Sequence, residues 1–237
     1  MNSLYSLTNA QKFNWSSVSG DLNPERVSHL ETYLAGNKIL DAGCGGGAYV
    51  EFLSRKGLEV TGIDKHKQFL RVAKEQSRIG TYVQCDITKL NFLDKTFDCT
   101  YCFDVLEHVD DKLAIQELAR VTTSRLIIAV PKEDEIMHEF NLTFLHYQDK
   151  THLRNYSEQS LRELVTTINY SKLSIFPELQ VPARFLVKKM ILWHGLHSKQ
   201  NSISNKLTTL ILPKLLNKAS YQKIFTGLVA IVDLQED

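Results

Sequence analysis

A short apolar run that ends in an acid and a glycine-rich turn constrains this chain more than any other stretch. The segment Lys38–Tyr49 reads KILDAGCGGGAY, and helical spacing resumes through Val50 and Leu53. This order predicts a strand, a tight turn and a helix. Glycines let a backbone approach a ligand closely, and a helix start presents free N–H groups. The stretch therefore predicts a site for a nucleotide-like ligand.

Two classes of ligand compete for this turn. Gly43, Gly45 and Ala48 fit the dinucleotide pattern G-x-G-x-x-G/A, and Asp64 lies about where its ribose-binding acid should fall. Asp41 argues against a pyrophosphate, because its charge would repel phosphates in a partly desolvated cleft. A sulfonium cation that also carries an ammonium group would be attracted instead. The chain also lacks the Tyr-x-x-x-Lys pair of one dehydrogenase class.

The turn resembles the first motif of the class I S-adenosylmethionine-dependent methyltransferases, Asp-x-Gly-x-Gly-x-Gly. The motif is matched at Asp41, Gly43, Gly45 and Gly47. The resemblance implies that S-adenosyl-L-methionine is the cofactor. It also implies that the turn, with Cys44 in its centre, contacts this cofactor.

The second and third predicted strands also end in acids, Asp64 and Asp86, which Lys65 and Ile87 follow. Strand carboxyl ends form the ligand crevice of an open α/β sheet, so the acids should converge there. Asp64 suits two vicinal ribose hydroxyls, or it caps the helix that follows. In the resembled family, the residue at Asp86 hydrogen-bonds the adenine amino group while its neighbour packs on the ring. We expect all four residues to contact the cofactor.

The fourth predicted strand is followed by DVLEHV, which matches the family's Asp-x-x-Glu-His motif. The resemblance places Asp104 and Val105 beside the methionine part of the cofactor. A helical turn would put Asp104, Glu107 and His108 on one face. With His152 they resemble the Glu-x-x-Glu-His…His magnesium sites of ubiquinone-pathway and small-RNA 2′-O-methyltransferases. Because Asp104 is shorter than Glu and is needed by the cofactor, a divalent metal is possible but no metal ligand is assigned.

Two histidines are the candidate bases. Methyl transfer is a direct displacement that depends on positioning, and a hydroxyl acceptor also benefits from a base. We prefer His152 over His108, because residues 149–157 resemble a signature of methyltransferases that act on small molecules and on sugar-linked or quinone substrates. The alternative for His152 is a structural bond to the backbone. O-methylation is expected, with N- or C-methylation, an RNA substrate or a non-catalytic cofactor-binding subunit as alternatives.

The alternation of strands and helices predicts an α/β fold with a Rossmann-like, seven-stranded, mostly parallel sheet and helices on both faces. The resemblance places the last strand antiparallel beside the fifth. One methyltransferase domain over 1–237 is expected. Its parts are an N-terminal helical cap at 1–36, a cofactor-binding core at 37–177, a helical lid insertion at 178–226 and the last strand at 227–233. Strands are expected from Ile39 to the acid Asp41 and over 58–63, 81–85, 97–103, 125–130, 173–176 and 228–232.

The cysteines and the N-terminus bear on location. Cys99-x-x-Cys102 looks like half a zinc site, but it falls inside a predicted strand, where residues three apart point to opposite faces. Buried free thiols fit better, and they suggest a reducing, cytoplasmic location. No secretory signal is evident near Met1, and no apolar run is long enough to span a bilayer. Near the N-terminus, Tyr5, Phe13 and Trp15 either line the cofactor pocket or anchor a mobile arm.

The segment from Leu179 to Val232 contains eight Lys and Arg residues and no acid. Its apolar residues recur at helical spacing, which favours a lid over a small-molecule substrate. Docking on a membrane surface is second, because the polar positions are rich in Lys. RNA binding is third, and the near-neutral whole chain gives no general signal for it. The oligomeric state is not indicated.

Overall fold

The computed structural model describes residues 6–12, 14–132, 151–181 and 224–235. By its contacts the chain divides into two compact units, one of residues 1–176 and 227–237 and one of residues 177–226. The expected helical lid lies outside the described residues except at its two ends. Tyr5, Phe13 and all eight cations of the basic segment also lie outside them.

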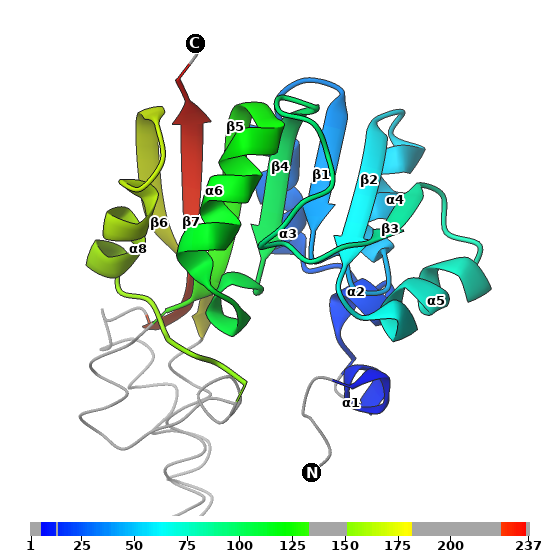
Figure 1. Ribbon diagram of the computed structural model, residues 1–237. Coiled ribbons are helices and arrows are strands. Elements are labelled where there is room, and N and C mark those ends of the chain that lie inside the picture. The colour runs from blue at the N-terminus through cyan, green and yellow to red at the C-terminus, as the bar shows by residue number, and fades with distance from the viewer. Residues whose placement is uncertain (1–5, 13, 133–150, 182–223, 236–237) are drawn as a thin grey trace, which may run out of the picture. The chain divides into compact units, whose positions relative to one another are not determined.

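Seven strands form a single sheet in the order β3-β2-β1-β4-β5-β7-β6 (Figure 1). The strands are β1 (Lys38–Ala42), β2 (Glu59–Asp64), β3 (Thr81–Gln84), β4 (Phe97–Phe103), β5 (Thr122–Pro131), β6 (Tyr170–Val181) and β7 (Ile224–Leu234). β1 to β5 pair in parallel. β7 pairs antiparallel with β5, as expected, with Ile127 opposite Ile231. The sheet is therefore mixed, and the predicted fold class is confirmed in this respect.

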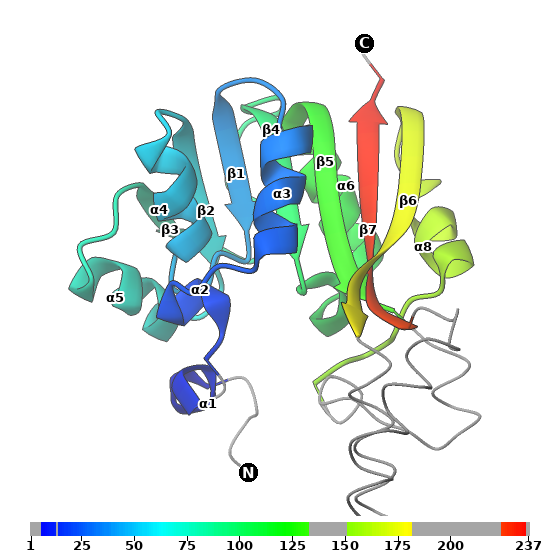
Figure 2. The same ribbon diagram turned by 180° about the vertical axis from the view of Figure 1, so that it is seen from behind.

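Helices cover both faces of the sheet (Figures 1 and 2). They are α1 (Leu7–Lys12), α2 (Ser16–Ser19), α3 (Pro24–Tyr33), α4 (Ala48–Arg55), α5 (Lys67–Glu75), α6 (Asp111–Val121) and α8 (Glu158–Val165), with the 3-10 turn η1 (Leu106–His108). The short helices α1 and α2 lie, with α3, within residues 1–36, where an N-terminal helical cap was expected. The N-cap of α8 is Ser157, and a capping box with Ser160 closes the first turn of the helix.

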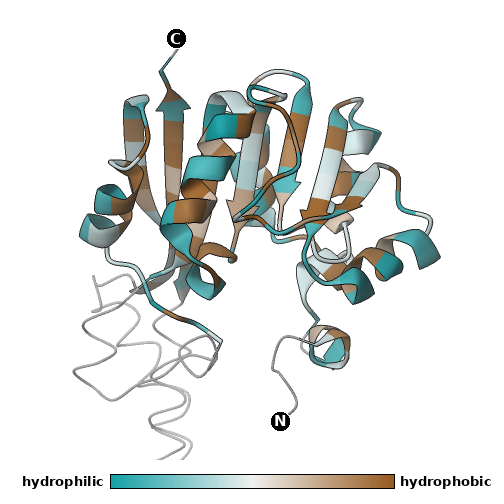
Figure 3. Cartoon of the chain, viewed as in Figure 1, coloured by the Kyte–Doolittle hydropathy of each residue, from teal (hydrophilic) through white to brown (hydrophobic). Residues whose placement is uncertain are grey.

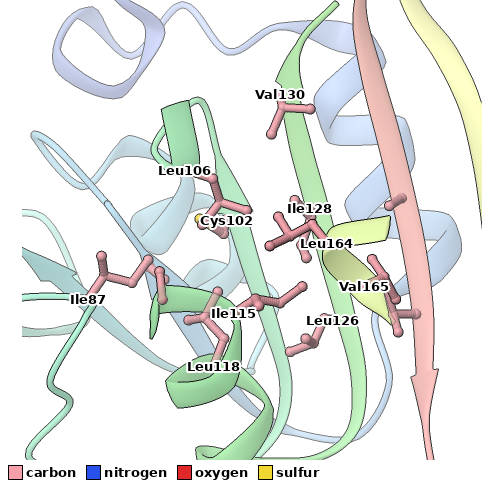
Figure 4. Close-up of a cluster of buried hydrophobic side chains, with 14 of the residues drawn as sticks. Ile87, Cys102, Leu106, Ile115, Leu118, Leu126, Ile128, Val130, Leu164 and Val165 are labelled. Atoms are coloured by element: carbon pink, nitrogen blue, oxygen red, sulfur yellow. The ribbon is translucent and has the colours of Figure 1, made fainter. Parts of the chain in front are cut away.

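The two faces carry separate hydrophobic clusters. On one face α6 and α8 pack on the sheet through Ile115, Leu118 and Leu164 (Figure 4). On the other face α3 and α4 contribute Leu30 and Leu53. Figure 3 shows the same division, with hydrophobic residues along the central strands and hydrophilic residues on the outer turns of the helices. This two-sided burial is why the strands read as nearly continuous apolar runs in the sequence.

The two cysteines of the Cys-x-x-Cys pair belong to different faces. Cys102 lies in the cluster beneath α6, and Cys99 lies in the cluster beneath α3 and α4. Both are free and buried. The prediction of buried thiols on opposite faces of a strand is confirmed.

Several strands extend beyond the predicted limits because polar residues at their ends still pair. Thr122, which precedes the predicted start of the fifth strand at 125, lies opposite Phe97 of β4 in the ladder. Arg125 and Asp233 lie opposite each other in β5 and β7 and form an ion pair, with Arg125 Nε 2.6 Å from Asp233 Oδ1. An apolar run stops before such residues, so the sequence pattern gives strands that are too short.

Candidate functional site

A cavity of about 250 Å³ opens at the carboxyl ends of β1, β2 and β3. This is the edge at which the acids were predicted to converge. Seven of the predicted site residues line the cavity: Gly43, Asp64, Lys65, Asp86, Ile87, Val105 and His108. Asp41 and Cys44 are buried and are not part of the cavity wall, and neither are Gly45, Gly47, Asp104 and His152. Six of the eleven predicted cofactor residues thus line one space.

The glycine turn is held in a conformation that other residues rarely adopt. Gly43, Gly45 and Gly47 have φ angles of 97°, 53° and 80°. A Cβ on Gly43 would lie 2.2 Å from Val105 Cγ2, and one on Gly47 would lie 2.4 Å from the Tyr82 ring. Glycine is therefore required at these positions both by backbone conformation and by space. The sequence predicted glycine here for close approach to a ligand; the positive φ angles and the tight contacts with the protein come from the fold.

Asp41 is enclosed at the end of β1, with only 4% of its surface exposed. It lies between Gly62 of β2 and Tyr101 of β4 in the sheet. Burial raises the pKa of Asp41 to about 8, and the charge of nearby Asp64 adds to this, whereas a hydrogen bond from Tyr101 opposes it. A positive charge bound nearby would stabilise the carboxylate form.

Asp64 links the end of β2 to the glycine turn. Its Oδ2 accepts a hydrogen bond from Gly45 N at 3.1 Å, and its Oδ1 accepts one from His66 N at 2.7 Å. Burial raises the pKa of Asp64, although both backbone bonds act against this. The N-cap of α5 is His66, so the predicted capping alternative is wrong in detail. Each carboxylate oxygen retains a further lone pair for a ligand hydroxyl.

Lys65 and Asp86 form an ion pair in the cavity wall, with Nζ 2.9 Å from Oδ2. Asp86 Oδ1 also accepts hydrogen bonds from the backbone N–H and the hydroxyl of Thr88. The Lys65 ammonium and these bonds lower the pKa of Asp86 to about 2. Ile87 beside it is buried and apolar. A charged acceptor next to a flat apolar surface suits a ring with an exocyclic amino group.

Asp104 departs from the predicted geometry. Its φ of 55° places it in the left-handed region, and only Leu106–His108 form a helical turn. Arg26 of α3, which is 4% exposed, donates from Nη2 to both Asp104 oxygens at 3.0 and 3.3 Å. The expectation that Asp104 shares a helical face with Glu107 and His108 is therefore wrong.

The two candidate bases lie together. The rings of His108 and His152 have centroids 4.6 Å apart and meet at 75°. His108 Nδ1 lies 3.0 Å from Thr151 Oγ1 and 3.3 Å from Thr151 O. A carbonyl can only accept, so a proton on Nδ1 leaves Nε2 with the lone pair. Glu107, which is 1% exposed, lies with one carboxylate oxygen 3.9 Å from His108 Nε2.

One ligand atom from each of Glu107, His108 and His152 lies within 4.8 Å of the others. A carboxylate with two imidazoles is a donor set that divalent transition metals accept. The described residues thus bring together three of the four residues that the sequence suggested for a metal, without Asp104. The spacing of these three side chains and the chemistry of their ligand atoms fit a divalent metal ion.

An N-terminal arm packs against the glycine turn. Arg78, which follows α5, donates from Nη1 to Ser17 O and Gly46 O at 2.7 and 2.6 Å, and from Nη2 to Val18 O at 2.8 Å. Trp15 stacks on Phe69 of α5, with ring centroids 6.3 Å apart. Trp15 thus anchors the arm, which was one of its two predicted roles.

Three arginines at the site were missed by sequence reasoning: Arg26, Arg78 and Arg154. Arg26 contacts a residue 78 positions away, and Arg78 reaches 61 positions back to Ser17. The only local signal was their position next to predicted helices, which is common for surface arginines. Nothing in the sequence pattern marked Arg26 and Arg78 as buried.

The strand order, with acids at successive strand ends and a glycine turn after the first, defines the class I methyltransferase fold. Residues 40–129 match the family described as "Methyltransferase domain". Residues 40–129 therefore form a domain of the class I S-adenosylmethionine-dependent methyltransferases, and the chain has the fold of this class. The cofactor of this class is S-adenosyl-L-methionine.

Curated relatives match part of the chain. It is 39% identical over 110 residues to a ubiquinone biosynthesis O-methyltransferase of Alkalilimnicola ehrlichii, which covers 43% of this chain and 44% of that enzyme. It is 37% identical over 126 residues to the enzyme of the same name from Histophilus somni, covering 45% of this chain and 52% of that one. The chain thus spans about half or less of the length of these relatives.

A solved structure shows the same fold over nearly the whole chain. The similarity to a SAM-dependent methyltransferase from Archaeoglobus fulgidus has a TM-score of 0.67 at 18% identity, over 97% of this chain and 99% of that one.

Proposed function

We propose that this protein transfers a methyl group from S-adenosyl-L-methionine to a hydroxyl oxygen of a small molecule. The observation that carries the proposal is the His108–His152 pair beside the buried Glu107, with His108 in the wall of the cavity. Oxygen needs a base as it attacks, and such a pair supplies one. The partial similarity to enzymes named O-methyltransferases supports the same acceptor atom.

Different residues of the chain hold different parts of the cofactor in this proposal. The cofactor supplies an electrophilic methyl group on a sulfonium. Asp64 provides free lone pairs for ribose hydroxyls, and Asp86 with Ile87 receives the adenine. Arg26 and Asp104 together offer a cation and an anion, which match the carboxylate and ammonium groups of an amino acid.

The His108–His152 pair is the base for the acceptor hydroxyl. We assign removal of the hydroxyl proton to His152, with His108 assisting His152 or replacing it. Glu107 beside the pair stabilises the imidazolium that results, because the carboxylate is buried and its charge is little screened. No other chemical step is needed, since displacement at the methyl depends mainly on alignment.

The cofactor assignment is tested with the purified protein. S-adenosylhomocysteine should raise the melting temperature, and NAD should leave it unchanged. Asp64→Ala should remove most of the shift, because the ribose contacts are lost. An undiminished shift in Asp64→Ala would refute the ribose assignment.

Turnover tests the reaction. The protein is incubated with cofactor and a panel of phenols, sugars and quinone precursors, and S-adenosylhomocysteine is measured. His152→Ala should lower kcat about 100-fold while the affinity for S-adenosylhomocysteine stays within about twofold. The same measurement on His108→Ala decides which ring takes the proton. Equal losses of turnover and cofactor affinity would make His152 structural, and no product with any acceptor would favour a non-catalytic subunit.

Metal-assisted deprotonation is the second candidate, favoured by the close grouping of Glu107, His108 and His152. These three residues would hold the ion, which would lower the pKa of an acceptor hydroxyl. Two imidazoles and one carboxylate suit Mn²⁺ or Zn²⁺ better than Mg²⁺, which prefers oxygen ligands. Loss of turnover with a chelator, and recovery with one of these ions, would favour this candidate over a free imidazole base.

The source of the acceptor is a separate proposal. A lipid-linked or quinone acceptor at a membrane surface would explain the basic segment, and a cytoplasmic enzyme could reach it from the water side. Among the described residues, no helix is long and apolar enough to cross a bilayer. Salt-sensitive sedimentation with anionic vesicles, lost on changing Lys188 and Lys189 to Glu, would support this acceptor over a soluble one. Steeply salt-dependent RNA binding would favour the RNA alternative.

A further inference from the structure

His152 lies on a segment that has no helix or strand of its own to fix it. Residues 151–156 precede the cap of α8. Two backbone bonds hold the segment, one from Leu153 N to Glu107 O at 2.7 Å and one from Tyr156 N to Pro131 O at 3.1 Å. The place of the His152 ring therefore depends on contacts that the segment makes with other elements.

One side chain of this segment reaches both ends of the turn that carries His108. Arg154 Nη1 lies 2.7 Å from Val109 O and 3.3 Å from Leu106 O, and it donates to these carbonyls. The two carbonyls flank Glu107 and His108 in the sequence. Arg154 thus cross-links the segment of His152 to the turn of His108.

Asp111 holds this arginine from the first turn of α6. Its Oδ1 lies 3.1 Å from Arg154 Nη1, and its Oδ2 accepts a hydrogen bond from the Tyr156 hydroxyl at 2.9 Å. The Asp111 side chain is 14% exposed and Tyr156 is 2% exposed. A helix start favours a carboxylate. Both oxygens of Asp111 are therefore used to fix residues of the same segment.

We propose that Arg154, held by Asp111, is a positioning residue that sets the His152 ring against the His108 ring and does not itself touch the substrate. Its effect on turnover rests on the proposed role of this imidazole pair. Nη1, at the far end of the guanidinium, meets two carbonyls and a carboxylate at once. A lysine ammonium in its place has a different shape and reach, so Arg154→Lys is not a conservative change here.

The first test needs no substrate. The nuclear Overhauser effect between the His108 and His152 rings is measured in protein labelled at histidine, since the rings are 4.6 Å apart. Arg154→Met keeps the apolar stem and should abolish this effect. The control is Arg162→Met, which breaks the exposed Arg162–Glu158 pair of α8 and should leave the effect unchanged.

A second variant covers the case in which Arg154→Met does not fold. Asp111→Asn keeps an oxygen for the Tyr156 hydroxyl and removes the ion pair with Arg154. It should weaken the effect between the rings without abolishing folding. An unchanged effect in a folded Arg154→Met protein, or in Asp111→Asn where the first variant fails, would overturn the inference.

The second test is a double-mutant cycle on turnover. Arg154→Met should lower kcat about 10- to 100-fold and leave the affinity for S-adenosylhomocysteine within about twofold. In a His152→Ala background it should have no further effect, because it acts through that ring. An independent, additive loss would show a structural role instead. If His152→Ala retains full turnover while Arg154→Met still separates the rings, the proposed role of His152 as the base fails and the positioning stands.

Discussion

The surroundings of Asp41 oppose its charged form. The titratable groups near it include the Tyr101 hydroxyl, the Asp64 carboxyl and the Cys44 thiol, and each would add negative charge on losing its proton. An acid whose pKa is raised to about 8 stays protonated in the folded state after it has ionised in the unfolded state. Folding stability therefore falls as the pH rises from about 4 to about 8.

Asp41→Asn should remove this dependence. The ligand-free variant should be more stable than the wild type at pH 8 by a few kcal/mol, roughly, and the difference should vanish towards pH 4. Thermal unfolding across this range measures it. The control is Asp98, whose pKa is shifted in the opposite direction. Asp98 accepts hydrogen bonds from the backbone N–H groups of Asn37 and Lys38, and these bonds lower its pKa. Asp98→Asn should therefore cost stability at neutral pH, and equal behaviour of the two variants would contradict the argument.

A matched pair of glycines separates backbone conformation from space. Gly43 and Gly57 have φ angles of 97° and 90°, but only at Gly43 would a Cβ meet another atom closely. Gly57→Ala should lower the free energy of unfolding by about 1–2 kcal/mol, because alanine is strained at a positive φ angle even where space is open. Gly43→Ala should cost more and also weaken S-adenosylhomocysteine binding, because Val105 must move. Urea unfolding and calorimetric titration measure both, and similar costs with intact binding would show that the turn adapts.

Among the elements, the N-terminal arm is attached to the glycine turn by hydrogen bonds from the side chain of Arg78. Arg78→Met should release α1 and α2 from the glycine turn, because three hydrogen bonds to carbonyls are lost. Amide exchange at residues 14–20 should accelerate at least tenfold, roughly, while exchange in β1 and β4 stays slow. The exposed Arg71 of α5 gives the control, and Arg71→Met should change neither. Unchanged exchange in Arg78→Met would place the attachment in Trp15 and Phe69 instead.

The elements also show where sequence reasoning succeeds and fails. Strand ends marked by Asp41, Asp64 and Asp86 were predicted because an apolar run followed by an acid is a local signal. The Arg78 and Arg154 contacts were not predicted, because they depend on which distant carbonyls the fold brings near. The helical face with Asp104 was wrong, since a residue at positive φ next to Arg26 cannot be inferred from spacing.

At the scale of the molecule, both faces of the sheet should unfold together. Ile127 and Ile128 are neighbours on β5, fully buried in opposite clusters. Alanine at either should cost about 2–5 kcal/mol and shift one cooperative urea transition. Leu93→Ala, at a residue 83% exposed, should change stability by less than about 0.5 kcal/mol. Two separate transitions in either isoleucine variant would show that the two clusters unfold independently.

The antiparallel pairing of β7 with β5 has a consequence for synthesis. Leu126 meets Val232 in the ladder, so β5 is translated about one hundred residues before its partner. At about 5–20 residues per second, the nascent β5 waits roughly 5–20 s with an apolar edge whose N–H and C=O groups are unpaired. Completion of the sheet is thus a late event on the ribosome, and the β5 edge is the place where a chaperone would bind or a wrong strand would pair.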